Sequence, residues 1–204
     1  MSTFICHCEK EIDLGIDDVI NLDEHPELID QMKENKFLSI TCPHCGSLVK
    51  PEITLRIQSA TLGIDYFIIP ELDRLSFYRN KVSVPQGCEV LIGFSELFER
   101  IRVIDAKLDV DAIEIIKYYL QCKAEDSDPE AEITIYFQKL ENGTLNFYAY
   151  GFSNGQAAKV PVPLTTYEQV LRDCATTKKQ QPFATIFSGN YRSIKKLAYT
   201  DDED

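Results

Sequence analysis

A five-residue motif, Cys42-Pro43-His44-Cys45-Gly46, carries the strongest structural signal in this sequence. Its two cysteines have the spacing of metal ligands, and the proline restricts the loop between them. Gly46 can adopt a positive φ angle, which lets backbone amides turn towards the sulfur atoms and stabilise their negative charge. The spacing and the turn chemistry together predict half of a metal site.

A second and tighter thiol pair lies near the start of the chain, in the stretch Cys6-His7-Cys8-Glu9. Here the cysteines are one residue closer together, and a glutamate stands where the other motif has its glycine. We expect a closed tetrahedral Zn²⁺ site with bonds of about 2.3 Å, formed by Cys6, Cys8, Cys42 and Cys45. Such an ion is structural, because it ties together two loops and leaves no open position for water or substrate.

Several other interpretations of the thiols remain open. His7 or His44 could replace one sulfur ligand, and Cys6 and Cys8 could be ordinary thiols. Cys42 and Cys45 could form a dithiol redox centre, because that spacing also serves thiol exchange. The second close pair favours a metal over redox chemistry. Three further cysteines are isolated in the sequence and are expected to be small buried hydrophobic residues: Cys88, Cys122 and Cys174.

Composition predicts a globular protein without a membrane segment. The chain has 204 residues, of which 44% are hydrophobic and 26% are charged. No apolar run approaches the roughly 20 residues that span a bilayer, and the start lacks the basic and apolar regions of a signal peptide. We therefore expect a cytoplasmic protein, in whose reducing environment close thiols more often bind metal than form disulfides.

Charge is unevenly distributed along the chain. Residues 1–90 hold 8 basic and 15 acidic side chains, whereas residues 131–204 hold 8 of each. A protein that binds nucleic acid needs a basic face, so the charge of the acidic half, which carries the thiols, argues against this function there. The alternative is nucleic-acid binding through a basic cluster near the C-terminus, although a solvated surface is the simpler interpretation: Lys178, Lys179, Arg192, Lys195 and Lys196.

Periodicity predicts an α+β fold that begins with a small antiparallel β module. The expected strands cover residues 12–16, 37–40, 53–57, 66–69 and 75–78. A helical insertion follows Pro26, with Asp23 as its N-cap. A helical middle segment then covers residues 95–104, capped by Ser95, and a stretch that starts after Asp109. We expect Asp109, Asp111 and Glu114 to be helix-start and surface residues.

The remainder is expected to form a small α+β domain. Strands are predicted at 133–140, 145–152, 160–162 and 183–187, with a helix at 166–174. Asn142-Gly143 favours a tight hairpin turn between the first two strands. A polar linker at 125–130 marks the boundary, which gives a metal-binding domain at 1–124, an α+β domain at 131–200 and an acidic tail at 201–204.

The chain resembles the CpXC proteins of bacteria and archaea, which are named for their Cys-Pro-x-Cys motif. The resemblance rests on residues 21–28, on Phe37, on the motif at 42–46, and on the later stretches 97–101, 108–111 and 115–117. It covers roughly residues 4–122. It implies a zinc-ribbon-like N-terminal module in which the four cysteines bind metal, although Cys6-His7-Cys8-Glu9 departs from the Cys-Pro-x-Cys-Gly form. The family has no established activity, so the resemblance implies a site and no reaction.

The sequence offers little support for an enzyme. It lacks a Gly-rich phosphate loop, a Gly-x-Ser-x-Gly elbow and a His-Glu-x-x-His helix, and two of its three histidines belong to the thiol motifs. We expect a protein without catalytic residues, in which a zinc-stabilised scaffold presents an acidic face to a protein partner. The sequence does not identify that partner.

Overall fold

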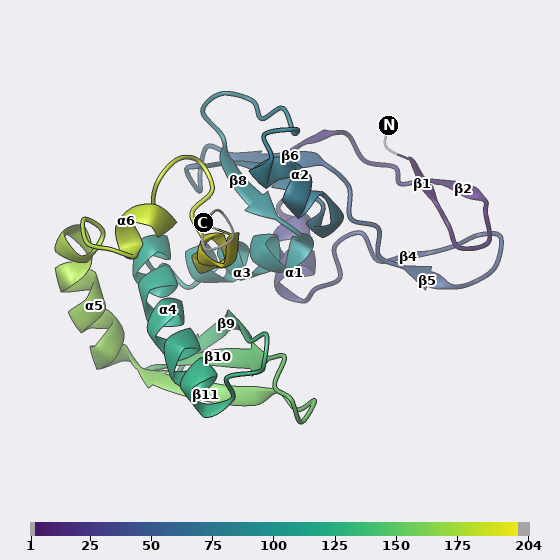
Figure 1. The fold of residues 1–204 in the computed structure, drawn as a ribbon. Helices are drawn as coiled ribbons and strands as arrows, with labels where there is room; N and C mark the ends of the chain where they lie inside the picture. Colours follow the sequence, from purple (N-terminus) through teal and green to yellow (C-terminus); the bar gives the residue numbers. More distant parts are fainter. Residues whose placement is uncertain (1–2, 200–204) are drawn as a thin grey trace. The chain divides into compact units, whose positions relative to one another are not determined.

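The computed structural model describes residues 3–199, so the predicted acidic tail at 201–204 lies outside the described residues. Its contacts divide the chain into two compact units, residues 1–98 and 99–204. Both units contain helices and strands, which confirms the α+β class (Figure 1). The division falls inside one helix, α3, which spans Phe94–Asp105.

The predicted boundary at 125–130 differs from this division. Helix α4 (Val110–Ser127) includes the first part of the expected linker and packs against the sheet of the second unit. The apolar face of this helix needs a partner, and the strands that follow it in the sequence provide one. The helical middle segment therefore belongs largely with the C-terminal strands.

The first unit contains two short hairpins and one larger sheet. The hairpins are antiparallel and pair β1 (Thr3–Ile5) with β2 (Glu11–Asp13), and β4 (Ile40–Thr41) with β5 (Leu48–Val49). The larger sheet has the order β3-β6-β7-β8 and is mixed, because β3 runs parallel to β6 and β7 parallel to β8. Its strands are Val19–Asn21, Leu55–Ser59, Ile64–Ile69 and Glu89–Ile92. The antiparallel prediction thus holds for the hairpins and for the β6-β7 pair only.

Helix α1 (Glu27–Lys33) is the predicted helical insertion, but Asp23 is not its N-cap. Pro26 occupies that position, and no side chain caps the helix. The Asp23 carboxylate instead accepts hydrogen bonds from the Ser59 hydroxyl at 2.6 Å and from the Ala60 amide at 2.8 Å. Asp23 therefore ties the start of the insertion to the turn after β6.

Two expected strands are helical in the structure. Residues 75–78 belong to α2 (Arg74–Tyr78), which follows the short 3₁₀ helix η1 (Glu71–Asp73), and residues 183–186 form α6 (Phe183–Ile186). Short apolar runs fit a buried helical turn as well as a strand, so periodicity alone does not separate them. The strand expected at 37–40 shrinks to β4, because Leu38 has a φ angle of 52°, which interrupts an extended backbone.

The second unit is a three-stranded antiparallel sheet with helices. Its strand order is β11-β10-β9, with β9 at Thr134–Glu141, β10 at Thr144–Tyr150 and β11 at Ala158–Pro163. The β9-β10 turn has positive φ angles at Asn142 and Gly143, as the sequence predicts. The chain continues through α5 (Leu164–Thr177), α6 and the 3₁₀ helix η2 (Ile194–Tyr199).

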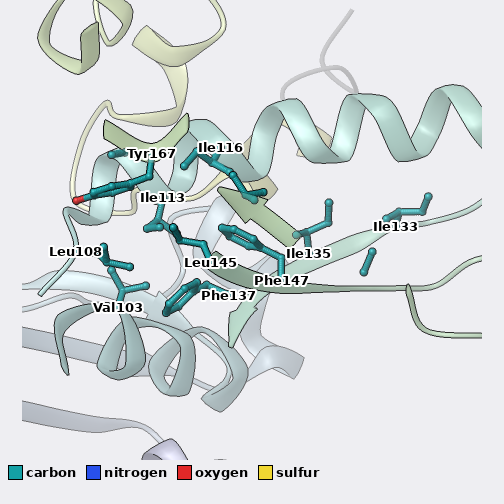
Figure 2. Packing of buried hydrophobic residues seen from close by; sticks show 13 residues of the cluster. Val103, Leu108, Ile113, Ile116, Ile133, Ile135, Phe137, Leu145, Phe147 and Tyr167 are labelled. Carbon is teal, nitrogen blue, oxygen red and sulfur yellow. The ribbon is translucent and has the colours of Figure 1, made fainter. Parts of the chain in front are cut away.

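One face of this sheet forms the core of the second unit with α4. Figure 2 shows Ile113 and Ile116 of α4 directed at the strand residues Phe137, Leu145 and Phe147. The rings of Phe137 and Phe147 meet edge to face with centroids 5.5 Å apart. Tyr136 and Tyr148, which neighbour these phenylalanines in the sequence, pair across the strands on the opposite face of the sheet.

Both edges of the sheet are partly closed to further pairing. The Leu164 amide donates to Gly143 O at 2.9 Å, so every second backbone nitrogen of β11, counted from Leu164, faces β10. The backbone nitrogens of Pro161 and Pro163 lie between these and face the open edge. Proline has no amide proton, so these positions offer no donor. On the other edge, the Phe137 amide donates to the Glu99 carboxylate at 2.6 Å.

Buried charges hold the segments of the second unit together. The Lys117 ammonium of α4 donates to Glu99 at 2.6 Å and to Glu114 at 2.8 Å, and all three side chains are buried. The other Glu114 oxygen accepts from the Ile194 amide at 3.0 Å, and Asp111 binds Lys178 and Arg192. Asp111 and Glu114 are therefore buried partners of the C-terminal segment, which corrects their assignment as surface residues.

No helix in residues 3–199 is long and apolar enough to cross a membrane.

Candidate metal centre

Two hairpin loops of the first unit bring the four predicted cysteines together. Cys6 and Cys8 lie between β1 and β2, and Cys42 and Cys45 lie between β4 and β5. Their sulfur atoms all lie within 4.8 Å of one another, which makes this the group of side chains in residues 3–199 that could hold a metal ion.

The sulfur separations fit a tetrahedral ion. Cys6 Sγ lies 3.8 Å from Cys45 Sγ, and Cys8 Sγ lies 3.8 Å from Cys42 Sγ. Metal–sulfur bonds of about 2.3 Å place tetrahedral sulfurs about 3.8 Å apart, whereas a disulfide requires about 2.05 Å. Both short contacts join one loop to the other, so the arrangement fits an ion shared between loops better than a bond within one of them.

The loop around Cys42 has the conformation that its sequence predicts. Gly46 adopts a φ angle of 74°, and its amide donates to Cys42 O at 2.9 Å. The Cys42 amide donates to Ser47 O at 2.8 Å, which closes the hairpin. The glycine turns the chain at the point where the next amides must face the sulfurs.

The loop around Cys6 forms a similar turn with one residue fewer between its cysteines. Glu9 takes the left-handed conformation of Gly46, with a φ angle of 64°. Its amide donates to Cys6 O at 2.8 Å, and the Cys6 amide donates to Lys10 O at 2.9 Å. The departure from the Cys-Pro-x-Cys-Gly form therefore does not prevent a similar turn, although a glutamate in this conformation costs roughly 1–2 kcal/mol relative to glycine.

The four thiols differ in exposure. Cys6 and Cys42 are 2% and 1% exposed and pack with Ile12, whereas Cys8 is half-buried and Cys45 is exposed. Half of the site is thus embedded in a small apolar cluster, and Cys45 forms its solvent-facing side.

The environments of Cys45 and Cys6 drive their pKa values in opposite directions. Hydrogen bonds from the Ser47 backbone amide and then from the Ser47 hydroxyl lower the pKa of Cys45 to about 6. The Cys8 backbone amide lowers the pKa of Cys6, but burial and the neighbouring thiols outweigh it and raise that pKa to about 12. The Cys45 thiolate is thus favoured over that of Cys6, and a cation at the centre would stabilise thiolates at all four positions. Ser47 carries no signal in the sequence beyond its place directly after Gly46, so it was not among the predicted site residues.

The three histidines are not equivalent. The His7 ring has Nδ1 3.5 Å from Cys6 Sγ and Nε2 3.9 Å from Cys45 Sγ, and Nε2 also lies 3.4 Å from Ser47 Oγ. His44 is exposed between Cys42 and Cys45, and His25 is exposed near Glu27, with Nδ1 3.4 Å from its carboxylate. Only the first of these histidines has a described contact with the sulfur cluster within residues 3–199.

The isolated cysteines lie apart from this cluster. Cys88 and Cys174 are buried as predicted, whereas Cys122 is only half-buried. The Cys88 thiol donates to Asp65 at 3.4 Å, and burial raises its pKa. A buried thiol with a raised pKa is a poor nucleophile, which agrees with a packing role.

Comparison with known proteins extends this description. The model of a family described as CpXC protein matches residues 5–117. A protein of Treponema pallidum (strain Nichols), described as an uncharacterized protein, is 26% identical over 216 residues, which cover 96% of this chain and 97% of the relative. No solved structure matches. The family match takes in both thiol loops and more than half of the chain, so this chain belongs to the CpXC protein family.

Proposed function

We propose that this protein is a cytoplasmic interaction scaffold whose first unit is stabilised by one structural Zn²⁺ ion. The observation that carries the zinc assignment is the group of four cysteine sulfurs within 4.8 Å of one another. Four thiolates in a tetrahedral arrangement select zinc over hard cations such as Mg²⁺ and Ca²⁺. All four positions belong to the protein, which leaves none for substrate and supports a structural role.

A protein partner with a basic surface is supported by the charge of the first unit. Between residues 9 and 34 the chain has ten acidic and two basic side chains, and every one of the ten is exposed. The two hairpins of the same unit also expose the apolar side chains Ile5 and Leu48, at 70% and 64%. Exposed acidic side chains suit a partner with the opposite charge, and exposed apolar ones add surface that a partner could bury.

The nucleic-acid alternative loses support from the contacts of the basic cluster. Lys178 and Arg192 both bind the Asp111 carboxylate, and Lys195 donates to the Tyr136 hydroxyl at 2.9 Å. Lys196 donates to Thr185 O at 3.2 Å and to the Ser188 carbonyl. Four of the five cations of that cluster are therefore engaged within the second unit, where they join segments of the fold.

Metal content tests the zinc proposal. Protein purified without added metal is analysed by elemental mass spectrometry as wild type, as Cys42→Ser and as the control Cys122→Ser. We expect one zinc per chain in the wild type and in Cys122→Ser, and loss of both zinc and thermal stability in Cys42→Ser. Metal-free wild type with a Cys42–Cys45 disulfide would instead support the redox alternative.

Charge reversal tests the partner proposal separately. Glu11→Lys/Asp17→Lys alters two exposed residues of the acidic segment, and Glu130→Lys/Glu168→Lys makes the same change of net charge in the second unit. Binding through the acidic face is supported if wild type and the control recover a partner from the native cell extract and Glu11→Lys/Asp17→Lys does not. Equal recovery by all three proteins contradicts it.

A further inference from the structure

The environment of His7 distinguishes it from a surface histidine. Its ring lies along the edge of the cluster that joins Cys6 and Cys45, with one nitrogen near each sulfur at 3.5 and 3.9 Å. A nitrogen and a sulfur bound to the same tetrahedral ion are about 3.5 Å apart, given bonds of about 2.0 and 2.3 Å. The imidazole is therefore held next to the ligand positions although four sulfurs already fill them.

The neighbouring sulfur is the most accessible of the four. Cys45 is exposed, whereas Cys6 and Cys42 are buried in the apolar cluster with Ile12. Exposed thiolates react with oxidants and alkylating agents before buried ones do. The site thus has one vulnerable ligand, and a second metal-binding group stands beside that ligand.

We infer that His7 is a reserve ligand, whose imidazole nitrogen binds the metal in place of Cys45 when that sulfur is lost. The inference rests on the proposed zinc site. Neutral imidazole and thiolate both suit Zn²⁺, and three cysteines with one histidine form a stable structural set. The vacated position lies 3.9 Å from Nε2, a distance within reach of rotations about the two side-chain torsions of His7. His44, although it stands between two ligands, has no such contact and serves as the matched control.

The test measures Co²⁺ and Zn²⁺ binding by wild type and by six variants. These are Cys45→Ser, Cys42→Ser, His7→Ala, His44→Ala, Cys45→Ser/His7→Ala and Cys45→Ser/His44→Ala. Co²⁺ reports the ligand set through its thiolate-to-metal absorption, and competition with a chelator gives the affinity. The ¹⁵N chemical shifts of the His7 ring nitrogens, measured by NMR of ¹⁵N-labelled protein, change when one nitrogen binds the metal and so report ligation directly.

We expect Cys45→Ser to keep one metal per chain, with thiolate absorption about one quarter lower, as three sulfurs replace four. His7→Ala should change the affinity of the wild type by less than about tenfold, but lower that of Cys45→Ser by at least about 100-fold. His44→Ala should change neither. The His7 nitrogen shift should appear in Cys45→Ser and be absent from the wild type.

Two outcomes overturn the inference. One is loss of metal and of folded structure by Cys45→Ser as complete as that of Cys42→Ser. The other is metal binding by Cys45→Ser that His7→Ala leaves unchanged. Either result leaves the zinc proposal standing as long as wild type binds one ion, whereas wild type that binds none contradicts the zinc proposal itself.

Discussion

Replacement of Lys117 by methionine should destabilise the second unit far more than an ordinary loss of a surface charge. The ammonium group donates to Glu99 at 2.6 Å and to Glu114 at 2.8 Å, and Lys117, Glu99 and Glu114 have side chains only 4%, 5% and 6% exposed. Methionine has a similar length and no charge, so the change removes the cation with little change in volume. Two carboxylates then remain buried beside each other.

The magnitude follows from that burial. Breaking a buried pair by removing one partner costs about 3–5 kcal/mol, because the remaining charge is neither hydrated nor compensated. Each carboxylate keeps one backbone donor, Phe137 N for Glu99 and Ile194 N for Glu114, so neither loses every hydrogen bond. We therefore expect a loss of about 3–4 kcal/mol near neutral pH.

The loss should depend on pH in a defined direction. Burial, joined by the charge of Glu114, raises the pKa of Glu99 even though Lys117 lowers it. Removing Lys117 therefore raises the pKa of Glu99 further. A carboxyl whose pKa is raised on folding gives its full stability below its unfolded pKa of about 4.3, and loses it as pH rises through the folded pKa. The penalty of Lys117→Met should accordingly be larger at pH 8 than at pH 5.

Urea denaturation, followed by circular dichroism, measures this penalty. The matched control is Lys139→Met, because Lys139 pairs with Glu141 at 2.9 Å with both side chains more than half exposed. That variant should lose at most about 1 kcal/mol. The variant Lys117→Met/Glu99→Gln/Glu114→Gln removes all three charges of this cluster and should recover most of the loss. The reasoning would be refuted if Lys117→Met and Lys139→Met lost equal stability, or if the loss in Lys117→Met did not depend on pH.

Three further changes test other parts of the structure. Gly46→Ala should lower the stability of the protein by about 1–2 kcal/mol in thermal denaturation, whereas Glu9→Gly, at the same backbone conformation, should leave it unchanged or raise it. Asp109→Ala should cost about 0.5–2 kcal/mol in urea, because its carboxylate caps α4; a loss below 0.3 kcal/mol contradicts this role. Arg56 lowers the pKa of Asp65 to about 2, so Asp65 stabilises the fold above its unfolded pKa and this contribution fades as pH falls towards 2. The stability difference between wild type and Asp65→Asn should shrink over that range, and a constant difference counts against the pair.

Local chemistry made the thiol loops and the hairpin predictable. Cysteine spacing, Gly46 and Asn142-Gly143 act over a few residues, so the sequence contains the whole argument for each turn. Asp109 likewise caps the helix that directly follows it, with its carboxylate accepting from Ala112 N at 2.8 Å. These features needed no knowledge of distant partners.

Partners from distant parts of the chain explain what the sequence did not reveal. Asp23 has the sequence position of a helix cap, but its carboxylate accepts hydrogen bonds from the turn after β6, more than thirty residues later. Asp111 and Glu114 look like surface residues because the cations and amides that bind them come from residues 178–194. A charged side chain is buried only where the fold brings a partner next to it, and sequence periodicity does not identify that partner.

The contact of His7 with two sulfurs follows the same logic. In the sequence, His7 and His44 each lie between two cysteines of the cluster, so spacing alone does not distinguish the two histidines. Only the fold of the two loops brings the His7 ring to Cys45 and Ser47 of the other loop. The difference between the histidines is therefore a property of the assembled site.

The prolines of β11 also restrict how this protein can associate with other chains. A strand from a second molecule would gain affinity at this edge from main-chain hydrogen bonds, and Pro161 and Pro163 would leave two of its carbonyl groups without donors. Each carbonyl stripped of water without a donor costs on the order of 1–3 kcal/mol. Newly made chains that meet at high local concentration are thus discouraged from joining β11 edge to edge, and recognition of this unit through that edge must rely on side chains.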